Sequence, residues 1–385
     1  MENRLISLRR ELHKNPEIGF DLPRTLTILR RELDEIGVEY TEKYGKSSIV
    51  ATVNPDKCGF TIGVRADIDA LPITEKNDTT YRSEIEGQMH ACGHDAHAAI
   101  GVETLRRVYA MREDIPCRVK FLFQSAEEYA PSGAKLMVED GVMDDIDCIV
   151  ALHCDGKFET GEIGFIDGPM NARSDGFKLK FRGRSAHAAR QEQGADAIMM
   201  AVRAYTDIEF MVAKEVAAKT PVIFNVGSIH GGVTNNIISD ECELFCTLRS
   251  WDDDFGDHIL ERIKAICTSV AESGGGSYEF IRCKQYPIVQ NDPRIGKRLT
   301  DAVRKLFGDG AIKARARELG GEDFSYMARV KPGYMFRLGI RNEALGITNV
   351  ELHTDCFSID EAALEVGVRV FTEFIIDNAD GKLLK

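Results

Sequence analysis

The sequence lacks any hydrophobic run that approaches the roughly 18 residues needed to cross a membrane. Its first residues enter an amphipathic helical pattern directly, without the apolar core of a signal peptide. We therefore expect neither a signal peptide nor a membrane span. An excess of positive charge is also missing: the formal net charge is -13, which argues against nucleic acid or an anionic membrane as a partner. Internal repeats and low-complexity segments are absent as well.

The ten cysteines do not form the crowded pattern of a disulfide-rich domain, because they are dispersed over 385 residues. Several lie inside apolar strand or helix patterns, where a reduced thiol packs as a small hydrophobic group. These are Cys117, Cys148, Cys246 and Cys267. We therefore expect a reducing compartment, the cytoplasm.

The length exceeds what one hydrophobic core usually holds, so we expect two domains. In residues 1–173 and 289–385, short apolar strands alternate with helical patterns, which predicts an α/β catalytic domain with a central, largely parallel sheet flanked by helices. Residues 174–288 follow the order β-α-β-β-α-β, which is typical of an inserted ferredoxin-like domain. The last helix is predicted to begin at Ser358, with Glu361 completing a capping box.

Residues 89–97 (MHACGHDAH) place one thiol and three imidazoles at a predicted loop-to-helix junction. Three strands of the α/β unit also end in acidic or imidazole side chains, and open α/β sheets bind ligands at those ends. The candidate metal donors are Cys92, His94, Glu128, His153 and His353. Five donors are one too many for a closed tetrahedral zinc site, but they suit two ions that share a bridging group. Thiolate, imidazole and carboxylate together favour Zn²⁺, and carboxylate-rich variants also accept Mn²⁺.

Two adjacent acids follow a predicted strand, and side chains on a strand point to opposite sides. Glu127 and Glu128 should therefore diverge, so that one can bind metal while the other faces the substrate as a general base. A metal-bound water loses its proton near neutral pH, and a positioned carboxylate can pass that proton to a leaving nitrogen.

Other polar residues near these donors invite structural interpretations. We expect His13 to pack or cap at a helix end and Asp69 to be a turn residue. Asp67 is a candidate to hold His94 or a ligand loop in place. For His90 and His97, a role in orienting the donors stays open. Two roles are equally open for Glu322 and Asp323: they could start a helix, or they could support the floor of the site.

Six short motifs are distributed along the chain, and the resemblance that they carry covers nearly all of it. They are LHKNPE at residues 12–17, RADIDALP at 65–72, HACGHDAH at 90–97, QSAEE at 124–128, GRSAHAA at 183–189 and GEDFS at 321–325. In these motifs the chain resembles the metal-dependent amidohydrolases that include hippurate hydrolases, indole-acetyl-amino-acid hydrolases, aminoacylases and N-acetyl-diaminopimelate deacetylases, which are relatives of carboxypeptidase G.

The resemblance implies roles for individual residues. The five candidate donors would bind the metals, and Glu127 would be the general acid/base. His187, on an inserted lid and dimerisation domain, would stabilise the oxyanion, often across a dimer interface. Asn236 and Arg249 would hold the substrate carboxylate, a task that suits a guanidinium because it forms two parallel hydrogen bonds. The chain departs from the family's lid motifs at residues 190–192 (RQE) and at Ser239, and these positions bear on substrate preference and the lid contact.

From the sequence we therefore predict a binuclear hydrolase that cleaves the amide bond of N-acyl-L-amino acids carrying an acetyl, benzoyl or aryl-acetyl group. It would hold two divalent ions per subunit, Zn²⁺ or Mn²⁺, and form a homodimer or tetramer through the lid. The alternatives are a metallo-dipeptidase or aminopeptidase, a metal-binding protein that has lost catalysis, and a redox enzyme that uses the thiol of Cys92.

Overall fold

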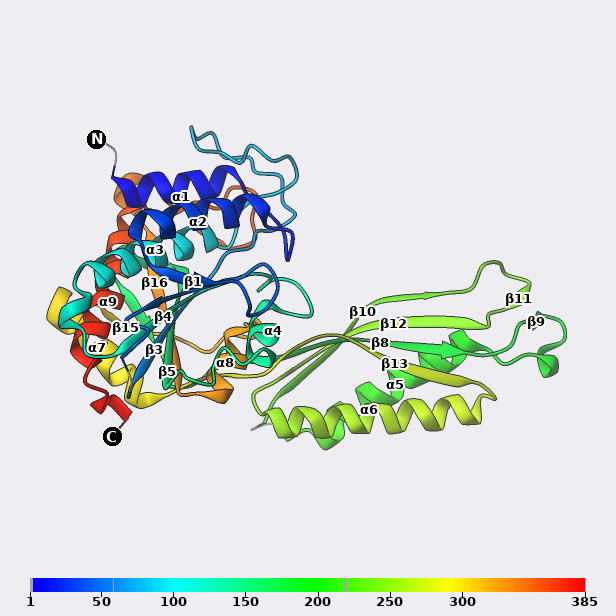
Figure 1. The fold of residues 1–385 in the computed structure, drawn as a ribbon. Helices are drawn as coiled ribbons and strands as arrows, with labels where there is room; N and C mark the ends of the chain where they lie inside the picture. The colour runs from blue at the N-terminus through cyan, green and yellow to red at the C-terminus, as the bar shows by residue number, and fades with distance from the viewer. Residues whose placement is uncertain (1–2, 58, 218–219, 385) are drawn as a thin grey trace. The chain divides into compact units, whose positions relative to one another are not determined.

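A computed structural model of the chain describes residues 3–57, 59–217 and 220–384 (Figure 1). The chain divides into two compact units. The first comprises Met1–Met170, Val289–Ala316 and Asp323–Lys385, and the second comprises Asn171–Ile288 and Arg317–Glu322. Among the described residues, no helix is both long enough and apolar enough to span a membrane.

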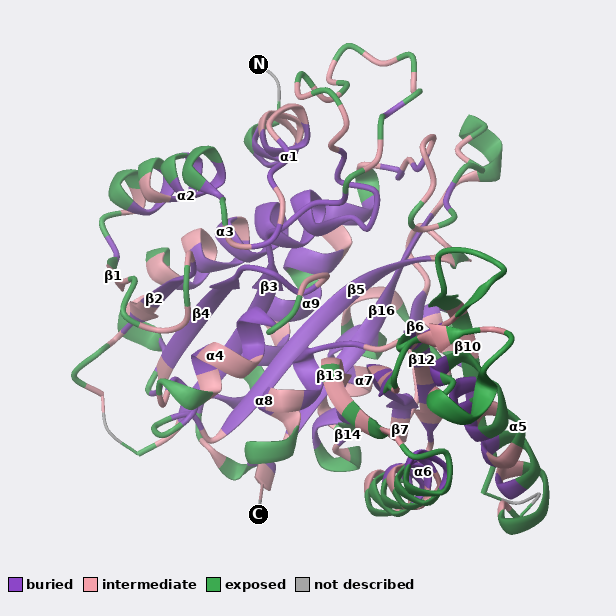
Figure 2. Ribbon diagram, turned by 90° about the vertical axis from the view of Figure 1, so that its right-hand side faces the viewer, coloured by how far each residue is buried: buried purple, intermediate pink, exposed green. Residues whose placement is uncertain are grey.

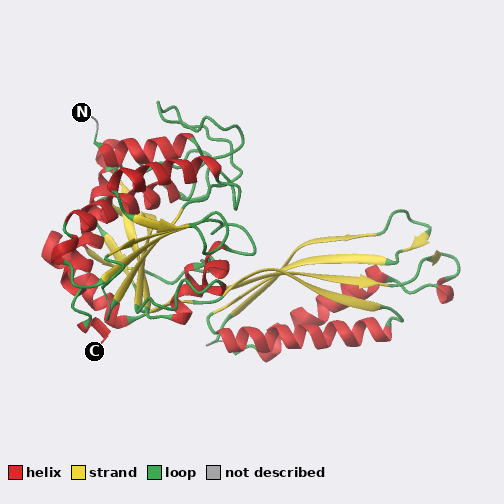
Figure 3. Cartoon of the chain, viewed as in Figure 1, coloured by secondary structure: helices red, strands yellow, loops and turns green. Residues whose placement is uncertain are grey.

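An eight-stranded sheet forms the centre of the first unit (Figure 3). Its spatial order is β1 (Glu39–Thr41), β2 (Ile49–Val53), β4 (Arg118–Gln124), β3 (Thr61–Asp67), β5 (Cys148–Glu159), β16 (Gly333–Arg341), β6 (Ile163–Phe165) and β15 (Ile312–Ala314). The four central strands β4, β3, β5 and β16 run parallel, whereas β1 and β2 add antiparallel pairs at one edge. The predicted α/β unit with a mostly parallel sheet is confirmed.

Helices cover both faces of this sheet, and alternate residues of a strand point to opposite faces. On β5, Val150 and Leu152 belong to one core, whereas Ile149 and Ala151 belong to another. The first core includes residues of α1 (Arg4–Lys14), α2 (Pro23–Ile36), α3 (His94–Ala110), α7 (Pro293–Phe307) and α9 (Ala362–Asn378), and the second includes residues of α4 (Gly133–Glu139) and α8 (Phe324–Val330). The central strands are therefore buried on both sides (Figure 2), which is why they read as continuous apolar runs.

The second unit has one four-stranded antiparallel sheet in the spatial order β10, β12, β8, β13. Its elements follow each other as β8 (Arg173–Arg182), α5 (Ala197–Glu215), β10 (Val222–Gly231), β12 (Glu241–Ser250), α6 (Asp253–Ser273) and β13 (Ser277–Tyr286). Phe177, Leu179 and Phe181 alternate along β8 and pack with apolar residues of both helices. Two short strands, β9 (Ala186–His187) and β11 (Ile237–Ile238), pair with each other beyond one end of this sheet (Figure 1).

The last helix begins later than the sequence predicts. Helix α9 starts at Ala362, and its N-cap residue Glu361 makes no side-chain capping bond. The backbone N–H and the hydroxyl of Ser358 both donate to the carbonyl oxygen of Asn349, at 2.7 and 3.3 Å. The Glu361 carboxylate instead accepts a bond of 2.6 Å from Arg10. The predicted capping box is therefore wrong, because tertiary contacts use both of its side chains.

Candidate metal centre and active site

A glycine at the N-terminus of α3 lets two candidate donors approach each other. Gly93 is the N-cap residue, with a φ of 85° in the left-handed region. A Cβ atom at this position would lie 3.0 Å from the sulfur of Cys154. Glycine is therefore favoured here twice, by the backbone conformation and by the lack of space. The residues on either side, Cys92 and His94, are both buried.

The structure brings all five predicted metal donors together, in two groups of three. Ligand atoms of Cys92, His94 and His153 lie within 4.8 Å of one another, and so do those of Cys92, Glu128 and His353. Cys92 belongs to both groups. The Sγ atom of Cys92 is 3.5 Å from His153 Nε2, and His353 Nε2 is 3.0 Å from Glu128 Oε1. This arrangement matches two ions that share one thiolate.

The imidazoles are oriented as metal ligands are. His94 Nδ1 donates to the carbonyl oxygen of Asp69 at 2.9 Å, and His153 Nδ1 donates to the carbonyl oxygen of Cys154 at 2.8 Å. Each ring therefore presents Nε2 to the cluster, with its other nitrogen fixed by a carbonyl group. His94 Nε2 is buried and makes no hydrogen bond to any residue that the structure describes. A cation would satisfy this atom, so the donor set fits a metal.

The electrostatics of Cys92 fit the same interpretation. Burial raises the pKa of its thiol well above the usual range, and the nearby charge of His94 offsets only part of this effect. The thiolate is the metal-binding form, and a bound cation stabilises it strongly. Cys92 is therefore a poor nucleophile on its own but a suitable bridging ligand.

The two adjacent glutamates do not diverge, contrary to the prediction. They lie in a bend beyond the end of β4, after Ala126 with its positive φ of 49°. Carboxylate oxygens of Glu127 and Glu128 lie within 4.8 Å of each other and of a ring nitrogen of His94. The alternation of an extended strand does not apply to this bend, so both carboxylates reach the cluster.

Asp69 holds this bend, a role that the sequence did not reveal. Its two carboxylate oxygens accept hydrogen bonds from the backbone N–H groups of Glu127 and Glu128, at 3.0 and 3.2 Å. Asp69 is buried, and its carbonyl oxygen also fixes His94. It was predicted to be a turn residue, yet it positions three of the residues that line the cluster.

A second buried network lies behind the cluster. The guanidinium of Arg65 contacts Asp67 and Asp323, each at 2.6 Å. The Asp323 carboxylate also accepts bonds from Gln124 and from the hydroxyl of Ser132, both at 2.7 Å. Of the two roles left open for Asp323, the structure therefore supports the one in the floor of the site. The network joins the ends of β3 and β4 to the start of α8.

A third group of potential ligands, Asp67, His94 and His97, is also within 4.8 Å. Two of its members already have other partners. His97 uses both ring nitrogens in hydrogen bonds, with the Asp67 carboxylate at 2.5 Å and with the backbone N–H of Cys154 at 2.9 Å. The other oxygen of Asp67 contacts Arg65. This group therefore supports the metal cluster from outside and does not add a position to it.

The two remaining histidines of the first unit differ from each other. His13 does not cap a helix: its ring contacts Asp95 at 2.8 Å and Glu75 at 3.2 Å, and all three residues are buried. Burial and Arg9 lower the pKa of His13, but these two carboxylates outweigh them, so the pKa is raised. Burial lowers the pKa of His90 to about 3. Neither ring nitrogen of His90 has a hydrogen-bond partner among the described residues.

In the second unit, His187 and Asn236 lie side by side. His187 belongs to β9, and the backbone N–H of Ala188 donates to the carbonyl oxygen of Asn236 at 3.0 Å. His187 Nδ1 accepts the N–H of Ala189 at 3.0 Å, which leaves Nε2 as the proton-bearing atom of an exposed ring. The hydroxyl of Ser239 donates to the carbonyl oxygen of Glu241 at 2.7 Å.

Arg249 lies at the other end of the same sheet. On β12, Glu241 pairs with Arg182, whereas Arg249 pairs with Ser174, near the point where the chain enters the second unit. Eight residues of extended strand separate the two positions, which corresponds to about 26 Å. Because Asn236 precedes β12, Arg249 and Asn236 of one chain are too far apart to hold one carboxylate.

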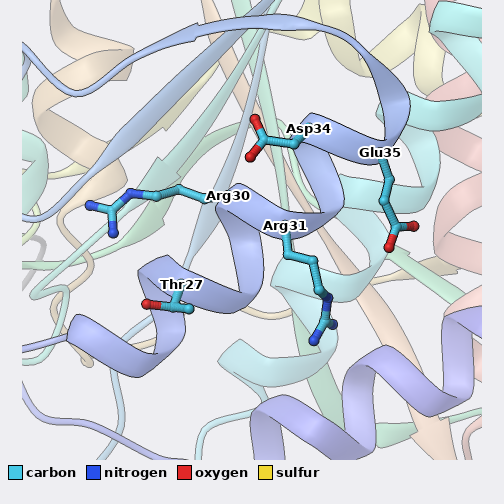
Figure 4. Close-up of a pocket in the computed structure, with 5 residues that line it drawn as sticks. All are labelled: Thr27, Arg30, Arg31, Asp34 and Glu35. Atoms are coloured by element: carbon cyan, nitrogen blue, oxygen red, sulfur yellow. The ribbon is translucent and has the colours of Figure 1, made fainter.

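A surface cavity of about 580 Å³ lies over α2 and contains none of the candidate ligands. Its lining consists of Thr27, Arg30, Arg31, Asp34 and Glu35 (Figure 4). The two guanidinium groups form ion pairs of 2.7 Å with Glu42 and Glu11. Paired surface charges of this kind give no indication of a catalytic site.

Comparison with known proteins agrees with this geometry. The model of "Peptidase family M20/M25/M40" matches residues 63–377. An N-acyl-L-amino acid amidohydrolase from Geobacillus stearothermophilus is 34% identical over 313 residues, which cover 80% of this chain and 84% of the relative. Thermostable carboxypeptidase 2 of Saccharolobus solfataricus is 31% identical over 371 residues, with 95% and 93% covered. A dinuclear metal binding peptidase of the M20 family from Bacillus subtilis has a TM-score of 0.80 at 28% identity, with 98% of each chain covered.

The family match spans most of the chain, and the two donor groups support two metal ions. The chain therefore belongs to peptidase family M20/M25/M40 and is a metal-dependent hydrolase.

Proposed function

We propose that this hydrolase cleaves the amide bond of N-acyl-L-amino acids and releases a carboxylic acid and a free amino acid. The observation that carries the proposal is the pair of donor groups sharing Cys92, with the buried carboxylate of Glu127 beside them. The amidohydrolase from Geobacillus stearothermophilus supports the choice of substrate. Zn²⁺ and Mn²⁺ are both compatible with thiolate, imidazole and carboxylate donors.

In this proposal Cys92, His94, Glu128, His153 and His353 hold two divalent ions. Such ions would lower the pKa of a coordinated water and polarise the scissile carbonyl. Glu127 takes a proton from the attacking water and delivers it to the leaving nitrogen. Asp69 keeps Glu127 in reach by fixing its backbone N–H. Glu127→Gln should therefore leave the ions bound and abolish nearly all turnover.

We also propose that the second unit, the predicted ferredoxin-like domain of residues 174–288, serves as lid and dimerisation domain. Helix α5 carries an exposed apolar stripe, with Met199 64% and Phe210 66% exposed, next to Val202. β10 is an edge strand with exposed Ile223 and Ile229. Exposed edges and apolar stripes of this kind favour association with another chain. A second copy of this chain is the proposed partner, in a dimer or a tetramer.

Light scattering tests the proposed dimer. The variant Met199→Lys/Phe210→Lys should be monomeric at a concentration where the wild type is dimeric. Phe245→Lys is the matched control, because Phe245 is exposed on β12 and lies outside the α5 stripe. A variant that stays dimeric would place the interface elsewhere.

A dimer would also resolve the distance between the proposed substrate-binding residues. Arg249 would hold the substrate carboxylate in its own subunit, whereas His187 and Asn236 of the partner copy would reach the same substrate and stabilise the oxyanion. A mixture of Glu127→Gln and His187→Ala chains tests this arrangement. Mixed dimers would contain one intact site, so the mixture should recover about a quarter of the wild-type rate. If His187 acted within its own chain, no activity would return.

A second candidate function is cleavage of the C-terminal residue of a peptide. The carboxypeptidase of Saccharolobus solfataricus favours it, and a C-terminal residue carries the same free carboxylate next to the scissile amide. A panel of N-acetyl, N-benzoyl and indole-acetyl amino acids against dipeptides and longer peptides separates the two candidates, with Glu127→Gln as the inactive control. Faster cleavage of peptides across the panel would overturn the first proposal.

The nine cysteines that the structure describes are free, in agreement with the proposed cytoplasmic location.

A further inference from the structure

The buried imidazole of His97 lies between two candidate ligands. Its ring centroid is 5.4 Å from that of His94 and 4.9 Å from that of His153. A backbone N–H can only donate, so the bond from Cys154 shows that His97 Nε2 accepts and that the ring proton is on Nδ1, facing Asp67. Both nitrogens are thus committed within the protein.

Each bond of His97 ends next to a metal donor. Cys154 follows His153 in β5, and its carbonyl oxygen accepts the Nδ1–H of the His153 ring. The backbone of Cys154 therefore sets the direction of that ring, and His97 anchors this backbone through its N–H. On the other side, the second oxygen of Asp67 is 3.7 Å from His94 Nε2.

We propose that His97 is a positioning residue that fixes His153 through the backbone N–H of Cys154. It thereby sets the affinity of one metal position, the one formed by Cys92, His94 and His153. Neither hydrogen-bond partner of His97, Asp67 or Cys154, belongs to the position formed by Cys92, Glu128 and His353. This inference rests on the proposed function, and it predicts that loss of His97 selectively weakens the binding of one ion. Outer partners of this kind change metal affinity about 10- to 100-fold.

Three substitutions separate the two hydrogen bonds of His97. Gln can place its side-chain oxygen near the original Nε2 and accept the Cys154 N–H. Asn is shorter and reaches only the original Nδ1, where its amide donates to Asp67. Ala makes neither bond. We therefore expect His97→Gln to keep the Zn²⁺ affinity that His97→Ala and His97→Asn lose.

The experiment measures Zn²⁺ affinity by competition with a chromophoric chelator, for each ion separately. In a His353→Ala background only the position with His153 is complete, and in a His153→Ala background only the position with His353 is complete. Co²⁺ substitution adds a spectroscopic readout, since thiolate charge-transfer absorption reports whether Cys92 is still a ligand. Ile100→Val, a buried change elsewhere in α3, controls for a general loss of stability.

We expect His97→Ala and His97→Asn to weaken Zn²⁺ binding 10- to 100-fold in the first background only, and His97→Gln to stay within about threefold of the parent. The inference is overturned if the Zn²⁺ affinity does not change in the His97 variants, or if His97→Asn keeps the affinity and His97→Gln loses it. It is also overturned if both metal positions lose affinity to the same extent, which would indicate the general loss of stability that Ile100→Val controls for. If the wild type binds two ions and the His97 variants keep its Zn²⁺ affinity, this inference alone is refuted. A wild-type chain that binds no ion would refute the proposed function as well.

Discussion

Replacing Asp69 with Asn tests the positioning of the proposed base most sharply. The change keeps the size of the side chain but converts one of its two acceptor oxygens into a donor. In the wild type these oxygens accept the backbone N–H groups of Glu127 and Glu128, at 3.0 and 3.2 Å. In the variant one of these N–H groups faces another donor inside a buried site.

The cost follows from these two bonds. A hydrogen bond to a charged acceptor contributes about 1.5–3 kcal/mol, and a neutral one contributes about 0.5–1.5 kcal/mol. Losing one bond to Asp69 and weakening the other should lower the free energy of unfolding by about 2–4 kcal/mol. The bend would also shift, and a misplacement of about 1 Å near the reacting atoms can cost about 100-fold in rate. We therefore expect a large loss of kcat at saturating metal for Asp69→Asn.

Urea unfolding and kcat for the preferred substrate measure the two effects. Asp21→Asn is the control, because Asp21 is an exposed carboxylate outside the site. If Asp69→Asn kept both the unfolding midpoint and the kcat of the wild type, Asp69 would not position the two glutamates and the account of the bend would be wrong.

Three further predictions concern the surroundings of the site. Gly93→Ala should lower the thermal midpoint, because a left-handed φ costs about 1–2 kcal/mol and the new methyl group meets the sulfur and the Cβ atom of Cys154. Adding Cys154→Ala removes the sulfur but keeps the Cβ atom, so it should recover only part of the loss, and full recovery would contradict the backbone argument. Asp323→Asn removes one carboxylate from the buried guanidinium of Arg65 and should cost about 3 kcal/mol in chemical denaturation, whereas an unchanged midpoint would show that the network is not coupled. Burial lowers the pKa of His13 but its two carboxylate partners raise it overall, so the folded state holds this proton more tightly. The contribution of the protonated His13 ring to the free energy of unfolding is complete below the unfolded pKa of about 6.5, and it disappears as the pH rises through the folded pKa. In urea titrations His13→Gln should therefore lose less stability above about pH 6.5 than the wild type, and parallel curves would refute the assignment.

Much of the architecture could be predicted because it depends on periodicity. The strand around Val150 is covered on both faces and is apolar throughout, whereas the strand around Phe177 is covered on one face and alternates between apolar and polar residues. Both patterns can be seen directly in the sequence. The five metal donors could be found for a related reason, since strands of a parallel sheet bring their ends to one edge.

The parts that could not be predicted depend on hydrogen bonds between distant segments. Asp69 binds backbone N–H groups that are about 60 residues away in the chain, and no residue type marks such an acceptor in advance. The divergence of the Glu127 and Glu128 side chains was predicted wrongly, because the positive φ of Ala126 ends the strand alternation on which the prediction depended. The separation of Asn236 and Arg249 was foreseeable in principle, since the predicted strand between them is long enough to keep them apart.

The most direct test of the central claim is the number of metal ions per chain, measured by elemental analysis after dialysis. We predict two ions in the wild type, one in His153→Ala and one in His353→Ala. Cys92→Ala should weaken both, because its thiolate belongs to both donor groups. A single ion in the fully loaded wild type, or a Cys92→Ala variant that retains both ions, would contradict a binuclear centre bridged by Cys92.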